Sequence, residues 1–123
     1  MMLTEPEIQS ALATAQAAFP NFTDWQYIDD PENSDYWGDF TMWGVYVANP
    51  GEMMSRRFFI TLTAGKEAWS GSLTIGKHSY YWSSADFGDA YLVGGDSADS
   101  LDGAIASLQQ AIATLFQTIV PSF

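Results

Sequence analysis

The sequence has no cysteine and few basic residues, and both shortages exclude classes of site. Without cysteine there is no disulfide, no thiolate nucleophile and no zinc–thiolate centre. The 4 Lys and Arg residues stand against 15 Asp and Glu residues, which gives a formal net charge of −11. Such a field repels phosphate backbones and anionic lipids, so we expect no direct nucleic-acid binding and no membrane association. A basic segment of a partner protein is its natural electrostatic complement.

Targeting signals and catalytic motifs are also missing. Residues 1–7 have no basic or apolar region of a signal peptide, and no apolar run reaches the roughly 18 residues of a membrane span. These features predict a cytoplasmic protein. His78 is the single histidine, and no serine lies in a nucleophile elbow. The acidic stretch 29–35 lacks the spacing and glycine of an EF-hand. We therefore expect no enzyme activity, no catalytic residue, no cofactor and no metal.

What the sequence does contain is enough apolar material for one core. The chain has 123 residues, of which 47% are hydrophobic and 15% aromatic, the latter well above ordinary usage. This length and composition predict a single acidic domain over residues 1–123.

Two helices are predicted, one near each end of the chain. Thr4 and Glu7 form a capping-box pattern, which predicts a helix over residues 4–19 that Pro20 ends. A second helix over residues 99–119 follows from a stripe at three- and four-residue steps. The stripe consists of Leu101, Ile105, Leu108, Ile112, Leu115 and Ile119. This helix carries no charge from residue 103 onward. It is either a core-facing helix with a neutral outer face or the contact surface of a homodimer.

Between the helices the apolar period changes to two, which is typical of strands. The predicted strands span residues 36–48, 56–64, 68–75 and 78–83, with shorter candidates at 25–28 and 91–93. Gly76 and Lys77 suit a two-residue hairpin loop between the third and fourth long strands. Short connections imply antiparallel neighbours. The predicted fold class is α+β, an antiparallel meander of four to five strands flanked by an N-terminal and a C-terminal helix. An α/β/α sandwich, with one helix on each face, is the alternative arrangement.

One face of this sheet is apolar and the other mixes Thr, Ser and aromatic residues. The predicted core comprises Leu12, Phe58, Ile60, Leu62, Leu73, Ile105, Leu108 and Ile112. Aromatic residues that the helices leave uncovered are candidates for a docking surface, because aromatics dominate interface hot spots. For the apolar part of a partner-binding patch we name Trp37, Trp43, Phe59 and Tyr81. Asp30, Glu32 and Asp35 are predicted to steer a basic partner toward it.

A resemblance adds to this interpretation. The stretches Trp69–Gly76 and Ser84–Tyr91, followed by the neutral Gln-rich helix, look like small acidic proteins of cyanobacterial type. Among these, the carboxysome shell-assembly factors are similar in size and element order. The resemblance implies an adaptor that captures a short tail of a shell protein, and it transfers no functional residue.

Three functions remain open on the sequence. The first is a non-catalytic adaptor, assembly factor or chaperone that captures a short basic segment through a sheet edge or an aromatic groove. The second is an inhibitor whose carboxylates mimic the phosphates of a nucleic acid in the basic groove of a nuclease or DNA-binding protein. The third is a carboxylate-dependent hydrolase.

Overall fold

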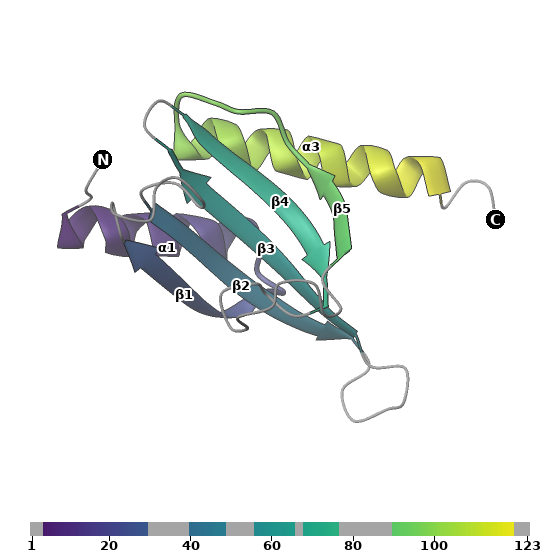
Figure 1. Cartoon of the computed structure of the whole chain (residues 1–123), viewed down its shortest axis with the longest axis horizontal. Helices are drawn as coiled ribbons and strands as arrows, with labels where there is room; N and C mark the ends of the chain where they lie inside the picture. The colour runs from purple at the N-terminus through teal and green to yellow at the C-terminus, as the bar shows by residue number, and fades with distance from the viewer. Residues whose placement is uncertain (1–3, 30–39, 49–55, 66–67, 77–89, 120–123) are drawn as a thin grey trace.

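Five strands form one antiparallel sheet among the residues that the structure describes. A computed structural model describes residues 4–29, 40–48, 56–65, 68–76 and 90–119. The helices are α1 (Glu5–Ala18) and α3 (Leu101–Ile119). The strands are β1 (Thr23–Asp29), β2 (Phe40–Ala48), β3 (Arg56–Ala64), β4 (Trp69–Ile75) and β5 (Ala90–Gly94), and they lie side by side in that order (Figure 1). The predicted α+β class, with a meander sheet and a helix at each end of the chain, is confirmed.

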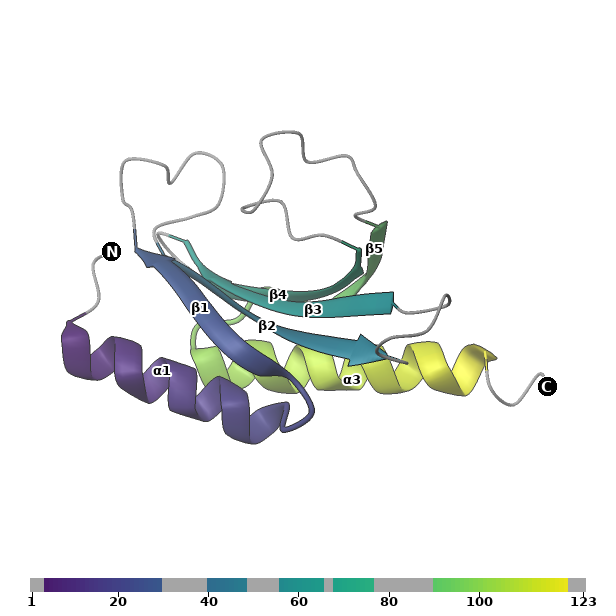
Figure 2. The ribbon, with the colours of Figure 1, turned by 90° about the horizontal axis from the view of Figure 1, so that it is seen from below.

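Both helices cover the same face of the sheet. Figure 2 shows α1 and α3 together on one side of the five strands, so the fold has two layers in its described part. Side chains from both helices join one core with Met42, Ile60 and Leu62. The alternative of an α/β/α sandwich is therefore wrong. The alternation of a strand predicts which residues share a face, but it does not state which face a distant helix covers.

Strand β4 pairs with a different neighbour from the one predicted. One edge of β4 pairs with β3. On its other edge, residues 72–75 pair with β5, and Ile75 lies opposite Ala90. The sequence predicted a hairpin partner at residues 78–83 for this second edge of β4, which β5 occupies instead. Gly76 instead has a positive φ of 111° and donates its N–H to the Arg57 carbonyl at 2.8 Å. Residues 36–39 and 78–83 lie outside the described residues.

The predicted core is largely correct. Ile60, Leu62, Leu73, Ile105 and Leu108 are buried. Leu12, Phe58 and Ile112 are partly buried and pack against the same core. Bulky residues on one strand face glycines on the next, which gives their side chains room to pack. Leu62 lies opposite Gly71, and the Trp25 ring lies against Gly44.

Small residues bring α3 into close contact with the sheet. Leu108 is fully buried and its side chain lies over Gly71 in β4. Gly95, directly after β5, lies against the α3 backbone at Ser107 and Leu108. The Asp96 N–H donates to the Ser107 hydroxyl at 2.7 Å. These contacts fix the position of α3 on the sheet.

In the described part of the chain, neither helix is long and apolar enough to cross a membrane.

Candidate binding cleft between the helix N-termini

The aromatic patch predicted from the sequence is not exposed where the structure describes it. Trp43 and Phe59 alternate along their strands with the core residues Met42 and Ile60, so they lie on the face opposite the helices. Only 3% and 4% of their surfaces are exposed. The prediction that these two side chains are uncovered is therefore wrong. Alternation identified their face correctly, but it contains no information on what buries that face.

The other residues of the predicted patch cannot be placed beside these two. Trp37, Tyr81, Asp30, Glu32 and Asp35 lie outside the described residues. Their role in binding a partner stays a prediction.

A different group of residues meets where α1 begins. The capping box expected from the sequence is present: the Thr4 N–H donates to Glu7 Oε1 at 2.9 Å, and the Glu7 N–H donates to Thr4 Oγ1 at 3.3 Å. The hydrogen bonds from the Thr4 backbone N–H and then from its hydroxyl lower the pKa of the Glu7 carboxyl. Glu7 is therefore a fixed, ionised carboxylate at the N-terminal end of this helix.

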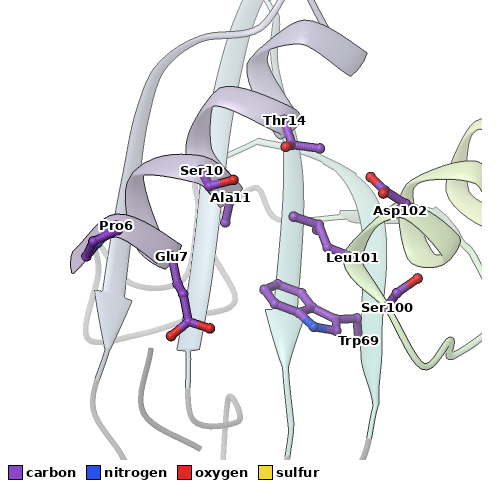
Figure 3. Close-up of a pocket in the computed structure, with 9 residues that line it drawn as sticks. All are labelled: Pro6, Glu7, Ser10, Ala11, Thr14, Trp69, Ser100, Leu101 and Asp102. Atoms are coloured by element: carbon purple, nitrogen blue, oxygen red, sulfur yellow. The ribbon is translucent and has the colours of Figure 1, made fainter. Parts of the chain in front are cut away.

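The N-terminus of α3 lies next to the start of β4. Trp69 and Ala98 exchange two backbone hydrogen bonds, each 2.8 Å long, which hold the segment before α3 against the sheet. Ser100 then caps α3 by accepting a hydrogen bond from the Gly103 N–H at 3.1 Å. As a result, Leu101 in the first turn of α3 lies close to Trp69, and Leu101 and Asp102 line the same cleft as residues of α1 (Figure 3).

A cleft of about 560 Å³ lies between these two helix ends. Its apolar lining consists of Pro6, Ala11, Trp69 and Leu101. Hydroxyl groups come from Ser10, Thr14 and Ser100. Its two carboxylates are Glu7 on α1 and Asp102 on α3. We call this site the acidic cleft.

The charge of the acidic cleft favours a cation over an anion. Each helix N-terminus carries the equivalent of roughly +0.5 elementary charge, so the two ends together supply about +1. The two carboxylates have a formal charge of about −2. The balance of about −1 suits one cationic group, and no Lys or Arg is among the described residues that line the cleft.

The shape of the lining further narrows the kind of cation. Lysine and arginine side chains have a long apolar stem and a charged tip. The indole of Trp69 and the side chain of Leu101 offer apolar contact for the stem. Glu7 and Asp102 lie at opposite ends of the lining, so either carboxylate can meet the charged tip (Figure 3). A small inorganic ion would not use the apolar lining. In the described part of the chain, no three His, Asp or Glu residues form a group that could hold a metal ion.

Sequence reasoning missed this site because each residue had a sufficient local explanation. Glu7 belongs to the capping-box pattern, Asp102 follows Asp96 and Asp99 at three-residue steps, and Trp69 lies within a predicted strand. One signal was present: both helices begin with acidic residues, and neither helix contains Lys or Arg. No pattern in the sequence indicates that the first turn of α3 lies next to α1.

Comparisons with known proteins add no relative. No protein-family model, no curated protein and no solved structure matches this chain.

Proposed function

We propose that this protein is a non-catalytic adaptor that captures a short basic segment of a partner protein in the acidic cleft. The observation that carries the proposal is a cleft in which Glu7 and Asp102, from separate helices, flank an apolar lining that includes Trp69. A cleft with this lining accommodates the stem of a Lys or Arg side chain and neutralises its tip. The net charge of −11 attracts a basic segment from a distance and speeds its association. Such capture also agrees with the tail-binding adaptor that the sequence resemblance implies.

The described residues give less support to the two alternative functions, a hydrolase and a nucleic-acid mimic. A hydrolase needs one carboxyl group with a raised pKa as general acid. The pKa of Glu7 is instead lowered by its hydrogen bonds to Thr4. A nucleic-acid mimic needs carboxylates in rows along one face, whereas α3 carries none after Asp102.

The test compares two double variants of equal charge. Glu7→Gln with Asp102→Asn removes both carboxylates of the acidic cleft, and glutamine keeps the acceptor that the capping box requires. Glu5→Gln with Asp99→Asn removes two exposed carboxylates from the same regions of the chain, outside the cleft. Isothermal titration with oligolysine and oligoarginine peptides, with oligoglutamate as the negative control, measures binding at two salt concentrations.

The two variants should separate local contacts from net charge. Exposed ion pairs contribute little each, so loss of two pairs should weaken binding about 2- to 30-fold. The control variant should bind nearly as the wild type does, and higher salt should weaken all three. If neither basic peptide binds, the proposed function is wrong. Equal weakening of the two variants would show that net charge, not the acidic cleft, governs binding.

A further inference from the structure

A second hollow lies on the other side of the contact between the two helices. The Gln109 amide donates to the Ala18 carbonyl at 3.3 Å, linking α3 to the last turn of α1. The residues that line the acidic cleft precede this contact in both helices. The residues that line the second hollow follow it, and they include Phe22 after α1 and Ile112 and Phe116 in α3. It has a volume of about 460 Å³, and we call it the apolar groove.

The apolar groove collects the exposed hydrophobic surface of the described residues. Among the described residues, four large hydrophobic side chains are exposed. Three of the four line this groove: Tyr46 is 42% exposed, Leu92 38% and Phe116 52%. Scattered exposed hydrophobics are normal, but their concentration beside a hollow marks an interaction site. Tyr46 contacts two further aromatic residues that line the groove. The centroid of its ring lies 5.9 Å from the ring centroid of Phe22 and 6.4 Å from that of Phe58.

The charge pattern excludes the basic segment as the occupant of this groove. Of the described residues that line it, only Asn21 and Tyr46 have a polar side-chain group, and none has a carboxylate. The α3 residues on its wall belong to the stretch after Asp102 that carries no charge. In a chain of net charge −11, this neutral surface is where a second copy can approach without close contact between like charges.

We propose that the apolar groove is the contact surface of a homodimer, in which Phe116 of each copy enters the groove of the other. A two-fold interface requires one surface to supply both the inserted group and the cavity that receives it. Phe116 on the wall of the groove, with half of its surface exposed, meets this requirement. The proposal gives a structural basis to the dimer through the C-terminal helix that the neutral sequence allows.

Sedimentation of the whole protein across micromolar to millimolar concentrations tests the dimer. The wild type should shift from monomer to dimer as its concentration rises. Phe116→Glu and Phe116→Ala should each raise the dimer dissociation constant about tenfold or more, as expected for an aromatic anchor. Gln110→Glu adds the same charge as Phe116→Glu at an exposed position of α3 outside the groove, and it should dimerise nearly as the wild type does. Circular dichroism confirms that each variant is folded.

Salt separates this proposal from the proposed function. Screening of two like-charged copies strengthens a dimer held by apolar contacts, whereas screening weakens capture of a basic peptide. A wild type that is monomeric at every concentration overturns the dimer, whatever the peptide titrations show. Binding of the neutral dye Nile red by a monomeric wild type, lost in Phe116→Ala, would instead assign the groove to a small apolar ligand. If Phe116→Glu and Gln110→Glu weaken dimerisation equally and Phe116→Ala has no effect, the proposed homodimer contact is also refuted.

Discussion

Replacing Gly95 by alanine tests how the sheet holds α3, the helix that contributes to both hollows. A Cβ atom at this position would lie 2.7 Å from the Leu108 nitrogen and 2.9 Å from the Ser107 carbonyl carbon. Both atoms belong to the helix backbone, so no side-chain rotation relieves the overlap. The whole helix must shift, and the hydrogen bond from the Asp96 N–H to Ser107 should weaken with it.

The expected loss of stability follows from two opposing effects. Overpacking a core costs about 1–3 kcal/mol, and a clash with backbone belongs at the upper end. Alanine also lowers the entropy of the unfolded chain, which returns about 0.4–1 kcal/mol. Gly95→Ala should therefore lower the free energy of unfolding by about 2 kcal/mol.

Two other glycines provide graded controls. A Cβ on Gly71 would meet the Cδ2 atoms of Leu62 at 2.9 Å and of Leu108 at 3.1 Å, and both are ends of side chains that can rotate. Gly71→Ala should thus cost about 1 kcal/mol before the entropic gain and come out near zero. At Gly65 the nearest atom is the Ala68 carbonyl oxygen at 3.6 Å, an ordinary contact. Gly65→Ala should stabilise the protein by about 0.4–1 kcal/mol.

Urea unfolding followed by circular dichroism and tryptophan fluorescence gives these free energies, provided that the two signals change together. The order of stability should be Gly65→Ala, then wild type and Gly71→Ala, then Gly95→Ala. If Gly95→Ala is as stable as the wild type, or if Gly71→Ala loses more, the close approach of α3 to Gly95 is not what fixes the helix.

Three further changes probe the core, the helix cap and the opposite face. Leu108→Ala should lower the free energy of unfolding by about 2–5 kcal/mol, because the Leu108 side chain is fully buried. The control Gln110→Ala, at an exposed position, should change it by under about 0.5 kcal/mol. A loss under about one kcal/mol for Leu108→Ala would contradict the place of Leu108 in the core. Thr4→Ala should raise the pKa of Glu7 toward its ordinary value, which an NMR pH titration measures; since the folded pKa is lowered, Glu7 contributes stability above its unfolded pKa and loses it as the pH falls through the folded one. Phe59→Ala should cost about 3–5 kcal/mol in urea unfolding because Phe59 is buried, and unchanged stability would restore it as a candidate contact for a partner.

Local chemistry made the helices predictable. The capping box of Thr4 and Glu7 acts within one turn, so it identified the start of α1 without knowledge of the rest of the fold. Ser100 caps α3 in the same way, and Pro20 follows the end of α1. The candidate cleft was not predictable, because its two carboxylates are far apart in sequence and meet only when both helices lie on the sheet.

Pairing between strands was only partly predictable. Strands β2, β3 and β4 follow one another through short connections, so their antiparallel order could be read from the sequence. Residues 77–89 follow β4, and β5 rather than the segment next in sequence occupies its second edge. Competition between two segments for one edge depends on packing across the sheet, and no local pattern encodes its outcome.

The sequence by itself determined the class of fold, the ends of the helices, the two faces of each strand and the acidic charge. The helix ends and the strand faces depend on residues within a few positions of one another, the charge depends on composition alone, and the class of fold depends on the order of the elements. The tertiary structure alone decided that both helices share one face, that Trp43 and Phe59 are buried on the other, and that an acidic cleft and an apolar groove flank the contact of Gln109 with Ala18. These features depend on which distant elements pack together, and that choice is made by the free energy of the whole core.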